Sequence, residues 1–147
     1  MIKGMVKGMA TTLSTMFRRP VTIQYPEQRR PVEERFRGAP ALLWDAEVSE
    51  PYCTGCGICQ RECPVGAISV TMKDNEKAKE GKSTRKKIVD VYQLNLGRCT
   101  FCEICVEVCN FNAIKMSHQF ELAGYSRKSL YRNLDQLIEM GSGRREG

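Results

Sequence analysis

The first seventeen residues carry apolar side chains at helical spacing. Steps of three and four place one set on a single face: Ile2, Met5, Val6, Met9, Leu13, Met16 and Phe17. Lys3 and Lys7 fall off that face, and Pro20 prevents the helix from continuing. A helix of this length rises about 24 Å, short of the roughly 30 Å of hydrocarbon in a bilayer. The pattern therefore predicts an amphipathic helix that lies on a membrane surface, or packs against another protein or its own domain.

Residues 20–40 contrast with this helix because they are rich in proline and charge. A short extended stretch at 21–25 stands between two prolines. Such a segment is either a linker or an arm that binds along another surface, and the aliphatic and aromatic residues of 21–25 favour the arm. We therefore assign residues 1–40 to an N-terminal amphipathic helix and an extended docking arm.

Two strand-like patterns frame the middle of the chain. Residues 41–45 are mostly apolar and predict an opening strand, whereas Tyr92, Leu94 and Leu96 alternate with polar residues and predict a half-buried strand. Between them, residues 73–87 are charged and lack a hydrophobic period, which predicts an exposed loop. We predict that residues 41–117 form one α+β domain.

Helical spacing returns near the end of the chain. Leucine and isoleucine side chains recur after Ser126, at Leu130, Leu134, Leu137 and Ile138. This spacing predicts a helix with one apolar face. We assign residues 118–147 to a C-terminal helical tail that docks on a neighbouring surface.

The chemistry of the chain is concentrated in its cysteines. All eight fall in two runs with the spacing Cys-x-x-Cys-x-x-Cys-x-x-x-Cys. This spacing is typical of proteins with two [4Fe-4S] clusters, in which the fourth cysteine of each run ligates the cluster built by the other run. We therefore predict cluster 1 on Cys53, Cys56, Cys59 and Cys109, and cluster 2 on Cys99, Cys102, Cys105 and Cys63. The function that this indicates is one-electron transfer.

The repeat extends beyond the cysteines. At an offset of 46 residues, Thr54 matches Thr100, Ile58 matches Ile104, and Ala67-Ile68 matches Ala113-Ile114. An internal duplication produces such matches, so we predict a pseudo-symmetric, bacterial ferredoxin-like domain with halves at 50–70 and 96–116. Pro64 is expected to end the helix of the first run. Asn110 stands in the same place after the second run, where Asn can stop a helix by adopting left-handed geometry.

Two other uses of cysteine fit the pattern less well. A disulfide framework suits a denser, secreted chain, and 8 cysteines in 147 residues fall below that density. A zinc site usually joins two Cys-x-x-Cys elements and does not need runs of four cysteines. Free thiolates favour a reducing compartment, most simply the cytoplasm.

No other pattern indicates substrate chemistry. Gly81-Lys82-Ser83 resembles the end of a phosphate-binding loop, but Glu76 occupies the place of its first glycine and no apolar strand precedes it. His118 is the only histidine, and eight thiolates already fill the cluster positions, so we expect a surface or packing residue there. We therefore predict neither a bound nucleotide nor a substrate site in this chain.

Net charge gives little support to nucleic-acid binding. The formal charge is +6, but two oxidised clusters with their thiolates add about −4 and leave about +2. The positions of the basic residues are more informative, because four of them precede the first acidic residue, Glu27: Lys3, Lys7, Arg18 and Arg19. This local charge suits anionic lipid headgroups or an acidic partner.

Several segments outside the cysteine runs carry a family resemblance. They are residues 19–26 (RPVTIQYP), 35–38 (RFRG) and 120–123 (FELA). Together with the paired runs, they resemble subunit I of NADH-quinone oxidoreductase, respiratory complex I. The cysteine runs alone would indicate only a two-cluster ferredoxin domain. Asn110 and the loop at 73–87 depart from the family pattern, but neither includes a predicted ligand.

The resemblance implies a non-catalytic subunit in the peripheral arm of a proton-translocating membrane complex, on the cytoplasmic side of the cell membrane. It would relay electrons from the NADH-oxidising module toward the cluster beside the quinone. Residues 1–19 and the arm would contact the membrane surface and the membrane subunits. The alternatives are the equivalent subunit of a membrane-bound hydrogenase or formate hydrogenlyase complex, a soluble two-cluster ferredoxin, and a zinc-based interaction module.

Overall fold

The computed structural model describes residues 2–142, which form two units that divide between Pro31 and Val32. The N-terminal unit contains helix α1 (Ile2–Met16), followed by chain without helix or strand. This helix covers the residues for which the sequence predicts one. Its own unit leaves the apolar side chains uncovered, with Met5 68% and Phe17 77% exposed. Among the described residues, no helix has the length and apolar character needed to cross a membrane.

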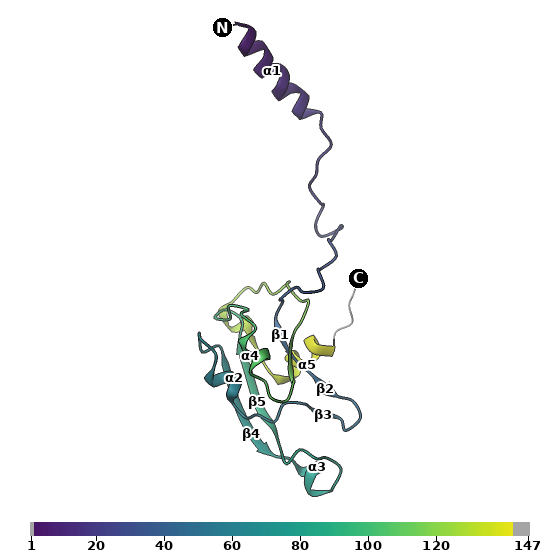
Figure 1. Cartoon of the computed structure of the whole chain (residues 1–147), viewed down its shortest axis with the longest axis vertical. Coiled ribbons are helices and arrows are strands. Elements are labelled where there is room, and N and C mark those ends of the chain that lie inside the picture. Colours follow the sequence, from purple (N-terminus) through teal and green to yellow (C-terminus); the bar gives the residue numbers. More distant parts are fainter. Residues whose placement is uncertain (1, 143–147) are drawn as a thin grey trace. The chain divides into compact units, whose positions relative to one another are not determined.

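The second unit is organised around a long hairpin, which Figure 1 shows with a short helix at its far end. Strand β4 (Ile68–Asp74) pairs antiparallel with β5 (Lys87–Asn95), and β7 (Tyr131–Arg132) adds to the other edge of β5. The pairing shifts between Thr71 and Met72, so that β5 has one extra residue there. This bulge turns both Val89 and Tyr92 into the core. The predicted half-buried strand is confirmed.

A second layer consists of two short two-stranded sheets. Strand β1 (Pro40–Leu42) pairs with β6 (Ile114–Met116), and β2 (Trp44–Asp45) pairs with β3 (Glu50–Pro51). The expected single opening strand is therefore two strands. The break occurs at Leu43, whose amide donates a 2.9 Å hydrogen bond to the Ala113 carbonyl outside either ladder.

The C-terminal segment packs on this layer. Helix α5 (Leu134–Ser142) buries Leu137 and Met140 and lies against β1 so closely that a Cβ on Gly141 would collide with the Leu42 carbonyl oxygen. The prediction that Leu130 belongs to the same helix is wrong. Leu130 ends a separate 3₁₀ turn, η1 (Arg127–Leu130), and α5 begins anew after Asn133. The Asn133 side chain caps α5 by accepting a 3.0 Å bond from the Gln136 amide.

The charged segment at 73–87 is not simply an exposed loop, which corrects the sequence expectation. Its ends belong to β4 and β5, and it contains helix α3 (Glu76–Lys79). Asn75 caps α3 by accepting from the Lys77 amide at 3.0 Å, and the Lys77 ammonium donates to the Val48 and Ser49 carbonyls, each at 2.7 Å. The segment is therefore fastened to the β2–β3 hairpin.

A buried carboxylate completes this attachment. Glu50 is only 2% exposed and accepts hydrogen bonds from Ser83 at 2.6 Å, Arg85 at 2.8 Å and Asn75 at 2.9 Å. Burial alone raises the pKa of Glu50, but these donors together outweigh it and hold the pKa below its ordinary value. Arg85 also donates to Asp45 at 3.0 Å, and this bond lowers the Asp45 pKa. Glu50 lies three residues before Cys53, so the network fixes the chain that leads into the first cysteine run.

Candidate metal centre

Both cysteine runs fold into the same local backbone. Each contains one short helix, α2 (Ile58–Arg61) or α4 (Ile104–Glu107), 46 residues apart. Left-handed residues also recur at this offset. The pairs, with their φ angles, are Gly55 (76°) and Phe101 (53°), Gly57 (75°) and Glu103 (70°), and Gly66 (56°) and Asn112 (48°).

The left-handed turns place different demands on the two halves. Gly55 allows close approach as well as positive φ, since a Cβ there would lie 2.9 Å from the Met72 Cβ and from the Thr71 carbonyl oxygen. In the second half, Phe101 and Glu103 adopt the same geometry with side chains, at a cost of about 1–2 kcal/mol each. Arg37 forms a 2.6 Å ion pair with Glu103 and holds it in place.

The helix ends differ from the sequence expectation. Helix α2 ends at Arg61 and α4 at Glu107, so both stop before the fourth cysteine of the run. Pro64 and Asn110 therefore lie beyond the helix ends. The left-handed residue after the second run is Asn112, in the place of Gly66, and not Asn110.

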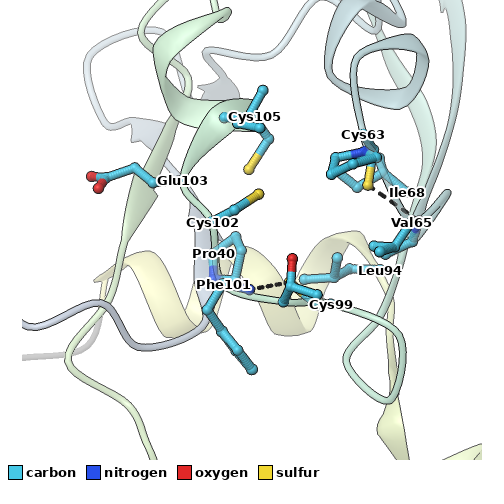
Figure 2. Close-up of a pocket in the computed structure, with 14 residues that line it drawn as sticks. Pro40, Cys63, Val65, Ile68, Leu94, Cys99, Phe101, Cys102, Glu103 and Cys105 are labelled. Carbon is cyan, nitrogen blue, oxygen red and sulfur yellow. Dashed lines mark hydrogen bonds between the residues drawn. The ribbon is translucent and has the colours of Figure 1, made fainter.

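Cys63 lies with the cysteines of the other run around one hollow. This hollow is lined by Cys63, Cys99, Cys102 and Cys105, together with apolar residues that include Ile68 and Leu94. Figure 2 shows Cys63 reaching into it from the side opposite Cys102 and Cys105, while the Glu103 carboxylate points away. The donors predicted for cluster 2 thus come together.

The other four cysteines also interact. Burial raises the pKa of Cys53 to about 11, and charge on Cys59, Cys109 and Cys56 acts in the same direction. Burial likewise raises the Cys59 pKa, and charge on Cys56 and Cys109 adds to it. Cys109 therefore lies near cysteines of the first run. Burial, followed by the charges of Cys59, Cys99, Cys102 and Cys63, raises the pKa of Cys105 to about 12, so Cys105 also interacts with one first-run cysteine besides Cys63.

These high pKa values bear on what the sulfurs can hold. At neutral pH the buried thiols stay protonated unless a cation compensates the charge of each thiolate. A bound group that contains metal ions supplies this positive charge, because metal ligation requires thiolates and releases their protons. Within residues 2–142, no three Cys, His, Asp or Glu side chains lie close enough together to hold a single metal ion.

Polar groups around the sulfurs fit a cluster as well. The Ala67 amide donates to Cys63 and the Ala113 amide to Cys109, both at 3.3 Å, and the Phe101 amide donates to Cys99 at 3.4 Å. Beside Cys53, the buried Thr54 hydroxyl has no hydrogen-bond partner among the described residues. An acceptor such as the inorganic sulfide of a cluster would satisfy it.

Sequence reasoning missed one group at this centre. The Tyr92 hydroxyl lies 3.6 Å from the Cys59 sulfur and is buried with it. The alternating pattern placed Tyr92 on the inner face of a strand, but it carried no signal of which atom the hydroxyl meets.

The residues set aside as non-functional make other contacts. A His118 ring nitrogen lies 3.2 Å from the Glu34 carbonyl oxygen. In the sequence that resembles a phosphate-binding loop, Ser83 bonds to Glu50 and the Lys82 ammonium pairs with Glu80 at 2.8 Å.

Comparison with known proteins first defines the class. Residues 52–113 match the 4Fe-4S dicluster domain family. The second unit is therefore a two-cluster iron-sulfur domain with mixed helices and strands, and its cofactors are two [4Fe-4S] clusters.

Individual relatives are more specific, and the chain spans 99% of one and 56% of another. The chain is 34% identical over 139 residues to NADH-quinone oxidoreductase subunit I 2 of Geobacter metallireducens, covering 95% of this chain and 99% of that one. It is 34% identical over 140 residues to the protein of the same name from Symbiobacterium thermophilum, covering 95% of this chain and 56% of the relative. The chain belongs to the NADH-quinone oxidoreductase subunit I family, which confirms the resemblance drawn from its sequence.

One solved structure is also similar. It is a chain of a membrane-bound sulfane sulfur reductase, an archaeal respiratory membrane complex, with 29% sequence identity and a TM-score of 0.53. The match covers 80% of this chain and 55% of that one.

Proposed function

We propose that this chain is the electron-relay subunit of a membrane-associated, proton-translocating NADH-quinone oxidoreductase, with no substrate site of its own. The observation that carries the proposal is the grouping of the eight cysteines. Cys63 lies with Cys99, Cys102 and Cys105, and Cys109 interacts with Cys53 and Cys59. Cluster 1 is then held by Cys53, Cys56, Cys59 and Cys109, and cluster 2 by Cys99, Cys102, Cys105 and Cys63.

When bound, each cluster supplies one-electron redox chemistry at a potential that the protein sets. The backbone amides of Ala67, Ala113 and Phe101 donate to ligand sulfurs and stabilise their negative charge. Ile68 and Leu94 line the hollow at cluster 2 and exclude water from it.

Each ligand group contains one exposed cysteine. Cys56 and Cys102 are exposed, whereas Cys53 and Cys59 are buried. The exposed cysteine of each group lies at the surface, where the redox centre of another subunit can approach. An exposed cysteine in each ligand group suits a relay between two partners.

The repeated helices and left-handed turns support a pseudo-symmetric domain in which neither half completes a cluster alone. The N-terminal unit supports attachment to a larger assembly. Helix α1 has an apolar face that its own unit leaves uncovered, and Lys3 and Lys7 lie off that face. This combination suits peripheral binding at the cytoplasmic membrane surface or on membrane subunits.

A second candidate rests on the structural match to a respiratory membrane complex with another activity. The same relay would then work in a hydrogenase-like or sulfur-reducing assembly with a different electron donor. The domain itself does not distinguish the two assemblies, because donor and acceptor sites belong to other subunits.

The direct test is to purify the tagged chain in mild detergent, identify the proteins that accompany it, and count iron. We expect quinone-reductase subunits, about eight irons per chain, and cubane signals in electron paramagnetic resonance after reduction with NADH. A nickel-containing partner and no response to NADH would favour the second candidate. Recovery of the chain alone, soluble and with both clusters, would refute a subunit role.

A further inference from the structure

The Tyr92 hydroxyl has a defined chemical role once Cys59 is a ligand. The oxygen lies 3.6 Å from the Cys59 sulfur, and both residues are buried. In a free thiol either atom could donate the hydrogen. A ligating thiolate carries no proton and can only accept, so Tyr92 becomes the donor.

This hydrogen bond distinguishes the two ligand groups. The cysteine equivalent to Cys59 in the second run, 46 residues on, is Cys105. Among the described residues, no side chain donates a hydrogen bond to Cys105, although several ligand sulfurs in both groups accept from backbone amides. Backbone amide donors thus occur in both halves of the repeat, whereas the Tyr92 hydroxyl serves a ligand in one half.

The origin of the asymmetry lies in the fold. Tyr92 belongs to β5, between the two runs, and the bulge opposite Thr71 and Met72 turns it inward. It interacts electrostatically with Cys59 and also with Cys105 and Cys53, so its hydroxyl is near predicted ligands of both clusters. Among the residues that the structure describes, the hydroxyl hydrogen-bonds to one cysteine, Cys59 of cluster 1.

Resting on the relay function proposed above, we infer that Tyr92 raises the reduction potential of cluster 1 relative to cluster 2, so that an electron shared by the two favours cluster 1. Reduction adds one electron and increases negative charge on the Cys59 sulfur. A donor held at that sulfur stabilises the reduced state more than the oxidised state. The Tyr92 O–H bond stays intact, and no proton is transferred.

The test is an electron paramagnetic resonance redox titration of the intact assembly that carries Tyr92→Phe. This variant removes only the hydroxyl and keeps the buried ring. We expect one of the two cubane signals to titrate at a lower potential, by about tenfold in its reduction equilibrium or 59 mV for one electron. The other signal should move much less. Tyr131→Phe is the matched control, because Tyr131 is half exposed and, within the part of the chain that the structure describes, its hydroxyl bonds to no cysteine.

Proton hyperfine spectroscopy assigns the effect to the hydrogen bond. In the wild type, the reduced cluster whose potential shifts should show a proton that exchanges in deuterated water and is lost in Tyr92→Phe. Unchanged potentials and an unchanged proton spectrum, with eight irons retained, would overturn the inference and leave the relay function standing. Equal shifts of both clusters would also overturn it. Absence of cubane signals in the wild type would instead defeat the relay proposal itself.

Discussion

Loss of the Arg85 charge should destabilise the domain through Glu50. We choose Arg85→Met because methionine fills similar space without a charge. Glu50 is 2% exposed and would keep two neutral donors, Ser83 and Asn75, at 2.6 and 2.9 Å. Removing one partner of a buried ion pair costs about 3–5 kcal/mol. Because two donors remain and the Arg85 side chain is itself 21% exposed, we expect the lower end, about 3 kcal/mol.

The assay follows loss of the brown cluster absorbance from the loaded full-length chain in urea under anaerobic conditions. A loss of about 3 kcal/mol corresponds to a little over a hundredfold in the folding equilibrium. The unfolding rate should rise by roughly tenfold to hundredfold, according to how much of the network is already lost at the transition state. Cluster loss should follow, because Glu50 fixes the chain that enters the first cysteine run.

Two further variants make the result decisive. Arg61→Met breaks an exposed pair with Glu62, 3.5 Å apart, and should change stability by less than about 1 kcal/mol. Removing both charges with Glu50→Gln and Arg85→Met together should restore part of the stability, since Glu50 is then neutral and only the Asp45 carboxylate loses its charged partner. Equal behaviour of Arg85→Met and Arg61→Met would refute the reasoning.

Three other changes test separate parts of the account. Gly55→Ala places a side chain against Met72 at positive φ and should reduce bound iron from about eight to about four per chain, measured on purified protein. Leu13→Glu should release the loaded chain from membranes in a sedimentation assay, while Thr11→Glu on the same helix should not. The lowered pKa of Glu50 means that its stabilisation is complete above the ordinary value of 4.5 and is lost as pH falls through the folded-state value. In urea, the stability difference between wild type and Glu50→Gln should therefore shrink below about pH 4.5; a constant difference would show that the carboxylate charge contributes nothing.

The cysteine spacing predicted the cofactor class, because that information is local to each run and its repeat; the assignment of ligands to each cluster stays a prediction. The helix at the N-terminus and the strand through Tyr92 followed from periodicity. The attachment of residues 73–87 to the domain did not follow from periodicity, since Arg85 and Ser83 bond to Glu50 more than thirty residues away. A charged segment is predicted to be solvent-exposed unless its buried partner is known.

Other features of the site also depend on three-dimensional context. Aligning the two halves places Gly55 and Gly57 opposite Phe101 and Glu103, and this could have indicated that both halves share left-handed turns. Nothing local indicates that the Tyr92 hydroxyl meets the Cys59 sulfur, because the contact depends on a bulge in the β4–β5 pairing. The strand pattern gave the direction of the side chain but not its partner.

Iron content of two double variants tests the crossed ligation most directly. If Cys63 and Cys102 serve the same cluster, Cys63→Ala with Cys102→Ala damages one cluster and should retain about four irons per chain. Cys63→Ala with Cys56→Ala then damages both clusters and should retain almost none. The reverse result, with iron kept by the second variant and lost by the first, would show that each run binds its own cluster and would contradict the account.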